Sequence, residues 1–131
     1  MNRILIAAHS LLRMTLWEFL EKHGYSVEIA EDGVKALLKL EHERFDLVIT
    51  EFGLFRMTGL DLIKCMQRRD SYKDVPTIVL ILPWESSAKD LIHHQGVFGA
   101  LTAPYKQEEL LSIIGEALAG QSIRQNGDSH K

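Results

Sequence analysis

The sequence predicts one α/β domain with a parallel sheet that helices cover on both faces. Short apolar runs alternate with stretches that carry apolar residues at helical spacing, and this alternation repeats along the chain. The runs are almost wholly apolar, which is typical of strands buried on both faces of a parallel sheet. At 131 residues, the chain is long enough to bury a single core without disulfides or a structural metal.

Five short apolar runs are expected to form the strands. In chain order, they are Arg3–Ile6, Ser26–Ala30, Asp46–Thr50, Thr77–Leu82 and Phe98–Thr102. Each run is followed by a helical pattern, so the chain is expected to consist of five strand–helix units.

Capping residues define the first two helices. The first is expected from about Leu11 to His23, because Ser10 can serve as its N-cap and Gly24 is a typical residue just after a helix C-terminus. The second is expected to begin after Asp32, which is a favoured capping residue. Its apolar face consists of Ala36, Leu37 and Leu40.

The remaining three helices are less sharply bounded. The third opens at Thr58-Gly59-Leu60-Asp61, which resembles a capping box, and ends near Arg68. The fourth is expected around Ser86–Gln95 and the fifth from Gln107 to Ala119. Residues 1–119 then form one domain, whereas residues 120–131 are polar and aperiodic and are expected to form a disordered tail or a linker.

Composition and charge argue against several classes of protein. The chain has 15 Lys and Arg residues against 18 Asp and Glu residues, a net charge of −3, which argues against nucleic acid or a membrane surface as a partner. The lone Cys65 cannot form an internal disulfide and favours a reducing, cytoplasmic environment. No apolar run reaches the length of a membrane-spanning helix or of a signal-peptide core.

Four stretches carry a resemblance to a known family. In order and spacing, EDGVKALLKL, FDLVITEFGLFRMTGLDLI, VPTIVL and PYKQEELL resemble the response-regulator receiver domain over residues 3–119. The resemblance implies a CheY-like, flavodoxin-like doubly wound sheet of strand order 2-1-3-4-5, with the working site at the carboxyl ends of the strands. It also implies a non-enzymatic module of two-component or phosphorelay signalling. Its partners would be a histidine kinase, another regulator, an output protein or a second copy of the chain.

The family's site is built around phosphorylation of an aspartate. The resemblance implies a carboxylate pair that holds Mg²⁺, a hydroxyl and a lysine that bind the phosphoryl oxygens, and an aromatic ring that reports occupancy. Here the matched positions carry residues that do not supply these groups. The carboxylate pair corresponds to Ala7 and Ala8, or to Ala8 and His9 in a second register. The aspartate, hydroxyl, lysine and aromatic correspond in that order to Glu51, Ile81, Ala103 and Ala100.

We therefore interpret the chain as a degenerate receiver, or pseudo-receiver, that acts by protein contact and has no catalytic residue, metal or cofactor. Without a metal or a lysine to offset its charge, a glutamate in place of the aspartate is poorly placed for phosphoryl transfer. The family keeps the bond before its site proline cis, so Ala103-Pro104 is expected to be cis as well.

Several alternatives for Glu51 and the whole domain remain open. Glu51 could be phosphorylated, could imitate a phosphoaspartate, could form a weak metal pair with His9, or could lie solvated at a strand end, paired with a backbone N–H or with Lys106. The last of these is the structural alternative that we favour. A small-molecule-binding flavodoxin-like domain is a further alternative, although the first loop, His9–Leu12, lacks the glycines that a phosphate-binding loop needs.

Exposed apolar residues suggest where a partner could bind. Leu12, Leu16, Phe19 and Leu20 define the buried face of the first helix. Met14 and Trp17 then point outward as candidate partner contacts. Trp84 is expected to cover the vacated pocket, with an interface role as its alternative. Tyr105 is expected to be a packing residue and is also a candidate interface residue.

Overall fold

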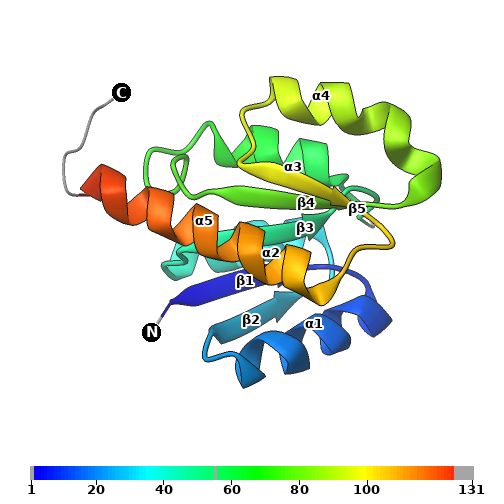
Figure 1. Cartoon of the computed structure of the whole chain (residues 1–131). Helices are drawn as coiled ribbons and strands as arrows, with labels where there is room; N and C mark the ends of the chain where they lie inside the picture. Colours follow the sequence, from blue (N-terminus) through cyan, green and yellow to red (C-terminus); the bar gives the residue numbers. More distant parts are fainter. Residues whose placement is uncertain (1, 55, 126–131) are drawn as a thin grey trace.

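The computed structural model, which describes residues 2–54 and 56–125, contains a five-stranded parallel sheet of order β2-β1-β3-β4-β5. This confirms both the parallel sheet and the strand order that the family resemblance implies. In chain order, the strands are β1 (Arg3–Ala7), β2 (Ser26–Ala30), β3 (Leu47–Glu51), β4 (Thr77–Ile81) and β5 (Gly99–Thr102). All of the strand arrows point to the same end of the sheet (Figure 1).

Helices cover both faces of the sheet, as the apolar runs predict. They are α1 (Ser10–Lys22), α2 (Gly33–His42), α3 (Gly59–Met66), α4 (Lys89–His94) and α5 (Gln107–Gln125), with a 3₁₀ segment, η1 (Pro83–Ala88), before α4. The helices α1 and α5 pack on one face, and α2, α3 and α4 pack on the other (Figure 1). Among the described residues, no helix is long and apolar enough to cross a membrane.

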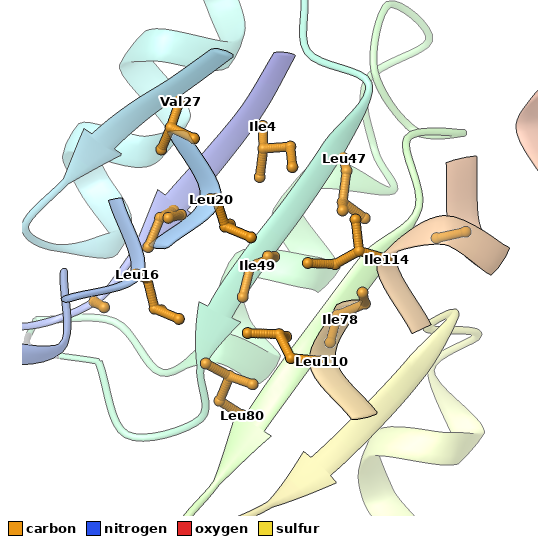
Figure 2. Close-up of a cluster of buried hydrophobic side chains, with 13 residues drawn as sticks. Ile4, Leu16, Leu20, Val27, Leu47, Ile49, Ile78, Leu80, Leu110 and Ile114 are labelled. Carbon is orange, nitrogen blue, oxygen red and sulfur yellow. The ribbon is translucent and has the colours of Figure 1, made fainter. Parts of the chain in front are cut away.

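The core consists of two layers because successive strand residues point to opposite faces. Ile4 and Ile6 of β1 pack toward α1 and α5, whereas Leu5 between them packs toward α2 and α3. Figure 2 shows the first layer, in which side chains of α1 and α5 meet those of the central strands: Leu16, Leu20, Leu47, Ile49, Ile78, Leu80, Leu110 and Ile114. Every residue of β3 and β4 is buried.

The helix starts agree with the sequence in two cases and differ in one. The side chains of Asp32 and Thr58 accept hydrogen bonds from the backbone of α2 and α3, as expected. The N-cap of α1, however, is His9 instead of Ser10, and it makes no side-chain capping bond. The backbone N–H of His9 instead donates to the side chain of Glu51, so this helix end is held by a residue of β3.

Two helix boundaries also differ from those expected. The segment expected as one helix around Ser86–Gln95 begins as the 3₁₀ segment η1, and α4 starts only at Lys89. The last helix does not end at Ala119 but continues to Gln125. Gly120 does not stop it, because a glycine within a helix costs only about 1 kcal/mol relative to alanine. The rest of the expected tail, residues 126–131, lies outside the described residues.

Two backbone features shape the loops near the sheet ends. Gly24, just after α1, has φ of +91°, a left-handed conformation that glycine adopts without strain. The Ala103-Pro104 bond is cis, as expected from the family resemblance.

We predict that Asp32→Ala lowers the free energy of unfolding by about 1–2 kcal/mol, as lost helix caps do. Asp32 is buried, accepts the N–H of Lys35 at 2.8 Å and contacts Arg56 at 2.9 Å. The Lys35 hydrogen bond and the guanidinium of Arg56 lower the pKa of Asp32. Its contribution is therefore present above the pKa of about 4 in the unfolded chain and is lost as the pH falls through the lower folded value.

Urea denaturation of wild type and variant from pH 7 down to pH 3 measures this contribution. Asp70→Ala is the matched control, since the Asp70 side chain is 98% exposed and, within the described part of the chain, forms an ion pair with Lys73 alone. Equal losses in the two variants, or a difference that does not shrink in acid, would contradict the prediction.

Candidate functional site

The carboxyl ends of the strands surround a small cavity of about 160 Å³. Because all five strands are parallel, the loops after β1, β3, β4 and β5 meet at this end of the sheet. The residues that line the cavity are His9, Leu12, Glu51, Gly53, Leu80, Ile81, Leu82, Glu85, Ala103 and Tyr105. Three of the expected site residues, Glu51, Ile81 and Ala103, are therefore brought together here.

Ala7 and Ala8 lie at the end of β1 and are almost completely buried, with exposed fractions of 0% and 1%. Their side chains belong to the two opposite core layers, Ala7 toward α2 and Ala8 toward α1, and neither lines the cavity. In the second register, His9 replaces Ala7 and does line the cavity. Neither register brings a carboxylate to this part of the site.

Glu51 is buried, which corrects the expectation that it lies solvated at the strand end. It is only 7% exposed, and its Oε1 accepts the backbone N–H of His9 at 2.9 Å. Its Oε2 lies 3.1 Å from Nε2 of the His9 ring. The expected backbone N–H partner is thus present, whereas Lys106 is not a partner of this carboxylate. The long glutamate side chain reaches across to the first loop and is covered by it.

The electrostatics of Glu51 follow from this burial. Removal from water raises the pKa of Glu51, the hydrogen bond and charge of His9 act in the opposite direction, and the nearby carboxylate of Glu85 raises it further. Burial and the charge of Glu51 also raise the pKa of Tyr105. The ionised form of Glu51 is therefore destabilised in this cavity.

The approach of α3 to β3 fixes the backbone beside Glu51. The N–H of Gly59 donates to the carbonyl of Phe52 at 2.7 Å. A Cβ at Gly59 would lie 2.5 Å from the carbonyl oxygen of Glu51, closer than side chains tolerate. A glycine is therefore needed at the start of α3 to keep the end of β3 in place.

The remaining expected site residues are packing residues in this structure. Ile81 is 1% exposed and packs with Val79 and Ile92 beneath α4. Ala100 lies in β5 opposite Val79 and packs at the edge of the same cluster. Ala103 lines the cavity just before the cis proline.

Trp84 does not cover the cavity, which corrects the expectation from the sequence. It is 77% exposed and does not line the cavity, whereas the neighbouring Glu85 does. The η1 turn is the cause, because Glu85 accepts the N–H of Leu82 through Oε1 at 2.9 Å and is thereby held inward. Sequence reasoning missed Glu85, although an acidic residue two positions after a proline is a typical sign of a helix start.

The first helix presents the faces that its pattern predicts. Leu16 and Leu20 are buried, and Leu12 and Phe19 are partly buried against the same core layer. Met14 and Trp17 are exposed by 52% and 38%, and Leu11, which the sequence argument did not single out, is exposed by 80%. Tyr105 is half-buried, packs against the core and lines the cavity, as expected of a packing residue.

The residues of this site do not fit Mg²⁺, the metal that the family resemblance implies. Mg²⁺ needs several oxygen ligands in near-octahedral arrangement. Within the ranges 2–54 and 56–125, no three His, Cys, Asp or Glu side chains are grouped so that they could hold a metal ion. Glu51 and His9 contact each other directly, so this pair is also a poor metal site.

This chain matches one family model and is similar to several known regulators. The chain matches the response regulator receiver domain family over residues 4–115. It is 33% identical to the response regulator MprA of Mycobacterium sp. (strain KMS) over 90% of this chain and 50% of that protein. It is 27% identical to a probable transcriptional regulator, ycf29, of Porphyra purpurea over 97% of this chain and 64% of that protein. The chain thus spans half to two thirds of these relatives.

A solved structure of nearly equal length agrees with these matches. The chemotaxis response regulator CheY4 of Vibrio cholerae is 30% identical to this chain and superposes on it with a TM-score of 0.82. The match covers 90% of this chain and 99% of that one.

We predict that Glu51→Gln changes how stability depends on pH. Because the pKa of Glu51 is raised in the fold, the folded protein favours the protonated form of this side chain. The contribution of Glu51 to the free energy of unfolding is therefore complete below the unfolded pKa of about 4.3. The wild type loses this contribution as the pH rises through the higher folded pKa. The amide keeps an acceptor for the His9 N–H but does not ionise. The variant should therefore gain stability relative to wild type between acidic and neutral pH.

Denaturation midpoints measured across this range provide the test. Glu108→Gln, which removes the same charge at an exposed residue of α5, controls for the change in net charge. A difference between Glu51→Gln and wild type that stays constant across this range would show that Glu51 does not titrate as a buried carboxylate.

Proposed function

The chain belongs to the response regulator receiver domain family, and from this premise we propose that it is a pseudo-receiver. In this proposal it is a two-component or phosphorelay signalling module, and not an enzyme, that acts through protein contacts without a phosphorylation cycle. The observation that carries the proposal is the state of Glu51. The residue at the phosphoacceptor position is buried, and its Oε1 already accepts the backbone N–H of His9.

Phosphoryl transfer to a carboxylate requires that its charge and that of the incoming group be offset. Metal ions, lysine and hydroxyl groups supply this stabilisation in phosphoryl-transfer sites. The corresponding positions here are Ala7 and Ala8, or Ala8 and His9 in the second register, together with Ile81 and Ala103. None of these residues is a carboxylate, a lysine or a hydroxyl residue. The chemistry of these side chains therefore argues against phosphorylation at Glu51.

The same residues argue against the idea that Glu51 imitates a phosphoaspartate. A fixed negative charge changes the conformation only if other groups contact it differently in two states. Ile81 is buried among apolar residues, and Ala100 has no ring to move. The negative charge of Glu51 is instead engaged by His9. We therefore propose one dominant conformation with fixed binding surfaces.

Receiver domains work with kinases and output proteins, and we propose a protein partner of this kind for this chain. The net charge of −3 supports a protein over nucleic acid or a membrane surface. We further propose a cytoplasmic location, which the single cysteine favours. One relative is named a probable transcriptional regulator, and this chain covers 64% of its length.

The outer face of α1 is the interface that we propose first. Leu11, Met14 and Trp17 expose apolar surface on this helix. Exposed apolar residues that occur together mark protein contacts more often than single ones do, and tryptophan is a frequent anchor. The second candidate is Trp84 in η1, which is the most exposed aromatic side chain of the described residues.

Phosphorylation is tested with acetyl phosphate, beryllofluoride and Mg²⁺. We expect no mass gain of a phosphoryl group, no broad change in the NMR spectrum, and no rise in melting temperature with millimolar Mg²⁺. A ligand that binds only the native state raises stability by RT ln(1 + [L]/Kd), so binding would be visible. A receiver with the complete family site is the positive control, and NaCl of equal ionic strength controls for salt. A phosphorylated Glu51 would refute the proposal.

Trp17→Ala tests the interface on α1. We expect it to lower the free energy of unfolding by no more than about 1 kcal/mol, as for partly exposed side chains, and to weaken a partner that binds wild type by about tenfold or more, as hot-spot residues do. Trp84→Ala is the matched control on η1. Normal partner binding by Trp17→Ala together with loss in Trp84→Ala would move the interface to η1.

A further inference from the structure

The cavity at the carboxyl ends of the strands has the opposite charge from a phosphate site. Apolar side chains form most of its wall: Leu12, Leu80, Ile81, Leu82 and Ala103. Its polar lining consists of His9, Glu51, Glu85 and Tyr105. Among the described residues that line it, none is a lysine or an arginine. An anion entering here would meet two carboxylates and no fixed cation.

Glu51 and Glu85 reach this cavity from two different segments. Glu51 ends β3, whereas Glu85 lies in η1 and is anchored through Oε1 by the N–H of Leu82. The second oxygen of Glu85, Oε2, lies against the backbone of Gly53, only 2.8 Å from where a Cβ would be. No described residue donates a hydrogen bond to this oxygen. This oxygen of Glu85, which is partly exposed, therefore remains available to accept a hydrogen bond from a ligand.

The side chain that now contacts Oε2 of Glu51 is largely exposed to water. The ring of His9 lies 3.1 Å from Oε2 of Glu51, but the His9 side chain is 64% exposed. Its exposed ring can turn into water at little cost, while the backbone N–H of His9 continues to hold Oε1 of Glu51. A cation that enters the cavity can therefore take the place of the imidazole without breaking the backbone hydrogen bond that joins α1 to Glu51 of β3.

We propose that this cavity binds a primary alkylammonium group, with the ammonium between Glu51 and Glu85 and the alkyl stem against Leu80, Ile81 and Ala103. An ammonium has three N–H donors, which match the free acceptor positions of two carboxylates. The alkyl stem removes apolar wall from water. The group could belong to a small amine or to a lysine side chain of a partner protein, since both present the same chemistry.

The volume of the cavity agrees with a ligand of this size. A dry apolar cavity of about 150 Å³ holds a benzene molecule, and this cavity measures about 160 Å³. A four-carbon stem with one ammonium is of similar size. Burial makes the attraction stronger than at the surface, because Glu51 is only 7% exposed and water screens the pair less.

The inference rests on the proposed function in one respect, namely that no phosphoryl group occupies this cavity.

NMR titration of the full chain with n-butylammonium chloride at constant ionic strength and neutral pH tests the proposed alkylammonium site. We expect saturable shifts confined to the backbone of His9, Glu51, Gly53, Leu82 and Glu85. Two controls divide the ligand into its parts: n-butanol lacks the charge and ammonium chloride lacks the stem. Each should bind at least about tenfold more weakly, as for loss of one charge-assisted contact or of several buried methylenes.

Variants separate a specific site from general attraction to an acidic protein. Glu51→Gln and Glu85→Gln should each weaken butylammonium binding by about tenfold, and Glu108→Gln, with the same change in charge, should not. Gly53→Ala keeps every charge but places a methyl group only 2.8 Å from Oε2 of Glu85, so this carboxylate must shift and binding should also weaken. Circular dichroism of each variant establishes that it is folded. Equal affinity in wild type and in folded Glu51→Gln and Glu85→Gln would overturn the proposal.

A second arm distinguishes the two sources of the ammonium. N-acetyl-lysine N-methylamide presents the side chain as a protein would, with backbone on both sides. Affinity similar to that of butylammonium supports a lysine of a partner protein, and exclusion of this compound supports a small amine. Absence of saturable shifts with all of these cations overturns the inference but leaves the proposed function intact, whereas phosphorylation of Glu51 overturns the proposed function itself.

Discussion

Burial of the central strands on both faces is the constraint on which the rest of this structure depends. Every residue of β3 and β4 is buried, so helices must cover each side of the sheet. Parallel strands then require crossover connections, and the loops that leave their carboxyl ends converge on one edge. The cavity exists at that edge because of the topology. It does not depend on which side chains line it, so the same topology would form a pocket here whether or not its wall carried the groups that the family resemblance implies.

Within this frame, Glu51 links two elements that are distant in sequence. It lies at the end of β3 and accepts the N–H at the start of α1, where the partial positive charge of the helix favours a carboxylate. This contact supplies an acceptor for one of the donors that every helix start leaves without an intrahelical partner. Glu51, which the family resemblance matches to the phosphoacceptor, thus has a structural role here. This role has an energetic cost, because a carboxylate is held away from water.

The fold could be predicted from the sequence to a greater extent than the site. Apolar runs located all five strands, and helical spacing located Leu16 and Leu20 in the core, because burial of apolar surface dominates both patterns. The order of the strands came from the family resemblance and not from periodicity. The orientations of Trp84 and Glu85 could not be predicted, because a short 3₁₀ turn decides which of two neighbouring residues points inward. The burial of Glu51 was missed because it depends on a loop that is far away in sequence.

The hydrogen bond between Glu51 and His9 also affects which substitutions this chain can accept without losing stability. An aspartate at this position would shorten the side chain by one methylene and withdraw the acceptor from the start of α1. Carboxylates at Ala7 or Ala8 would enter a core in which both positions are at most 1% exposed. Each single substitution toward the site that the family resemblance implies would therefore cost stability before all of its groups were present. The structure thus favours retention of its present site, and divergence from here is easier in the surface of α1 than in the cavity.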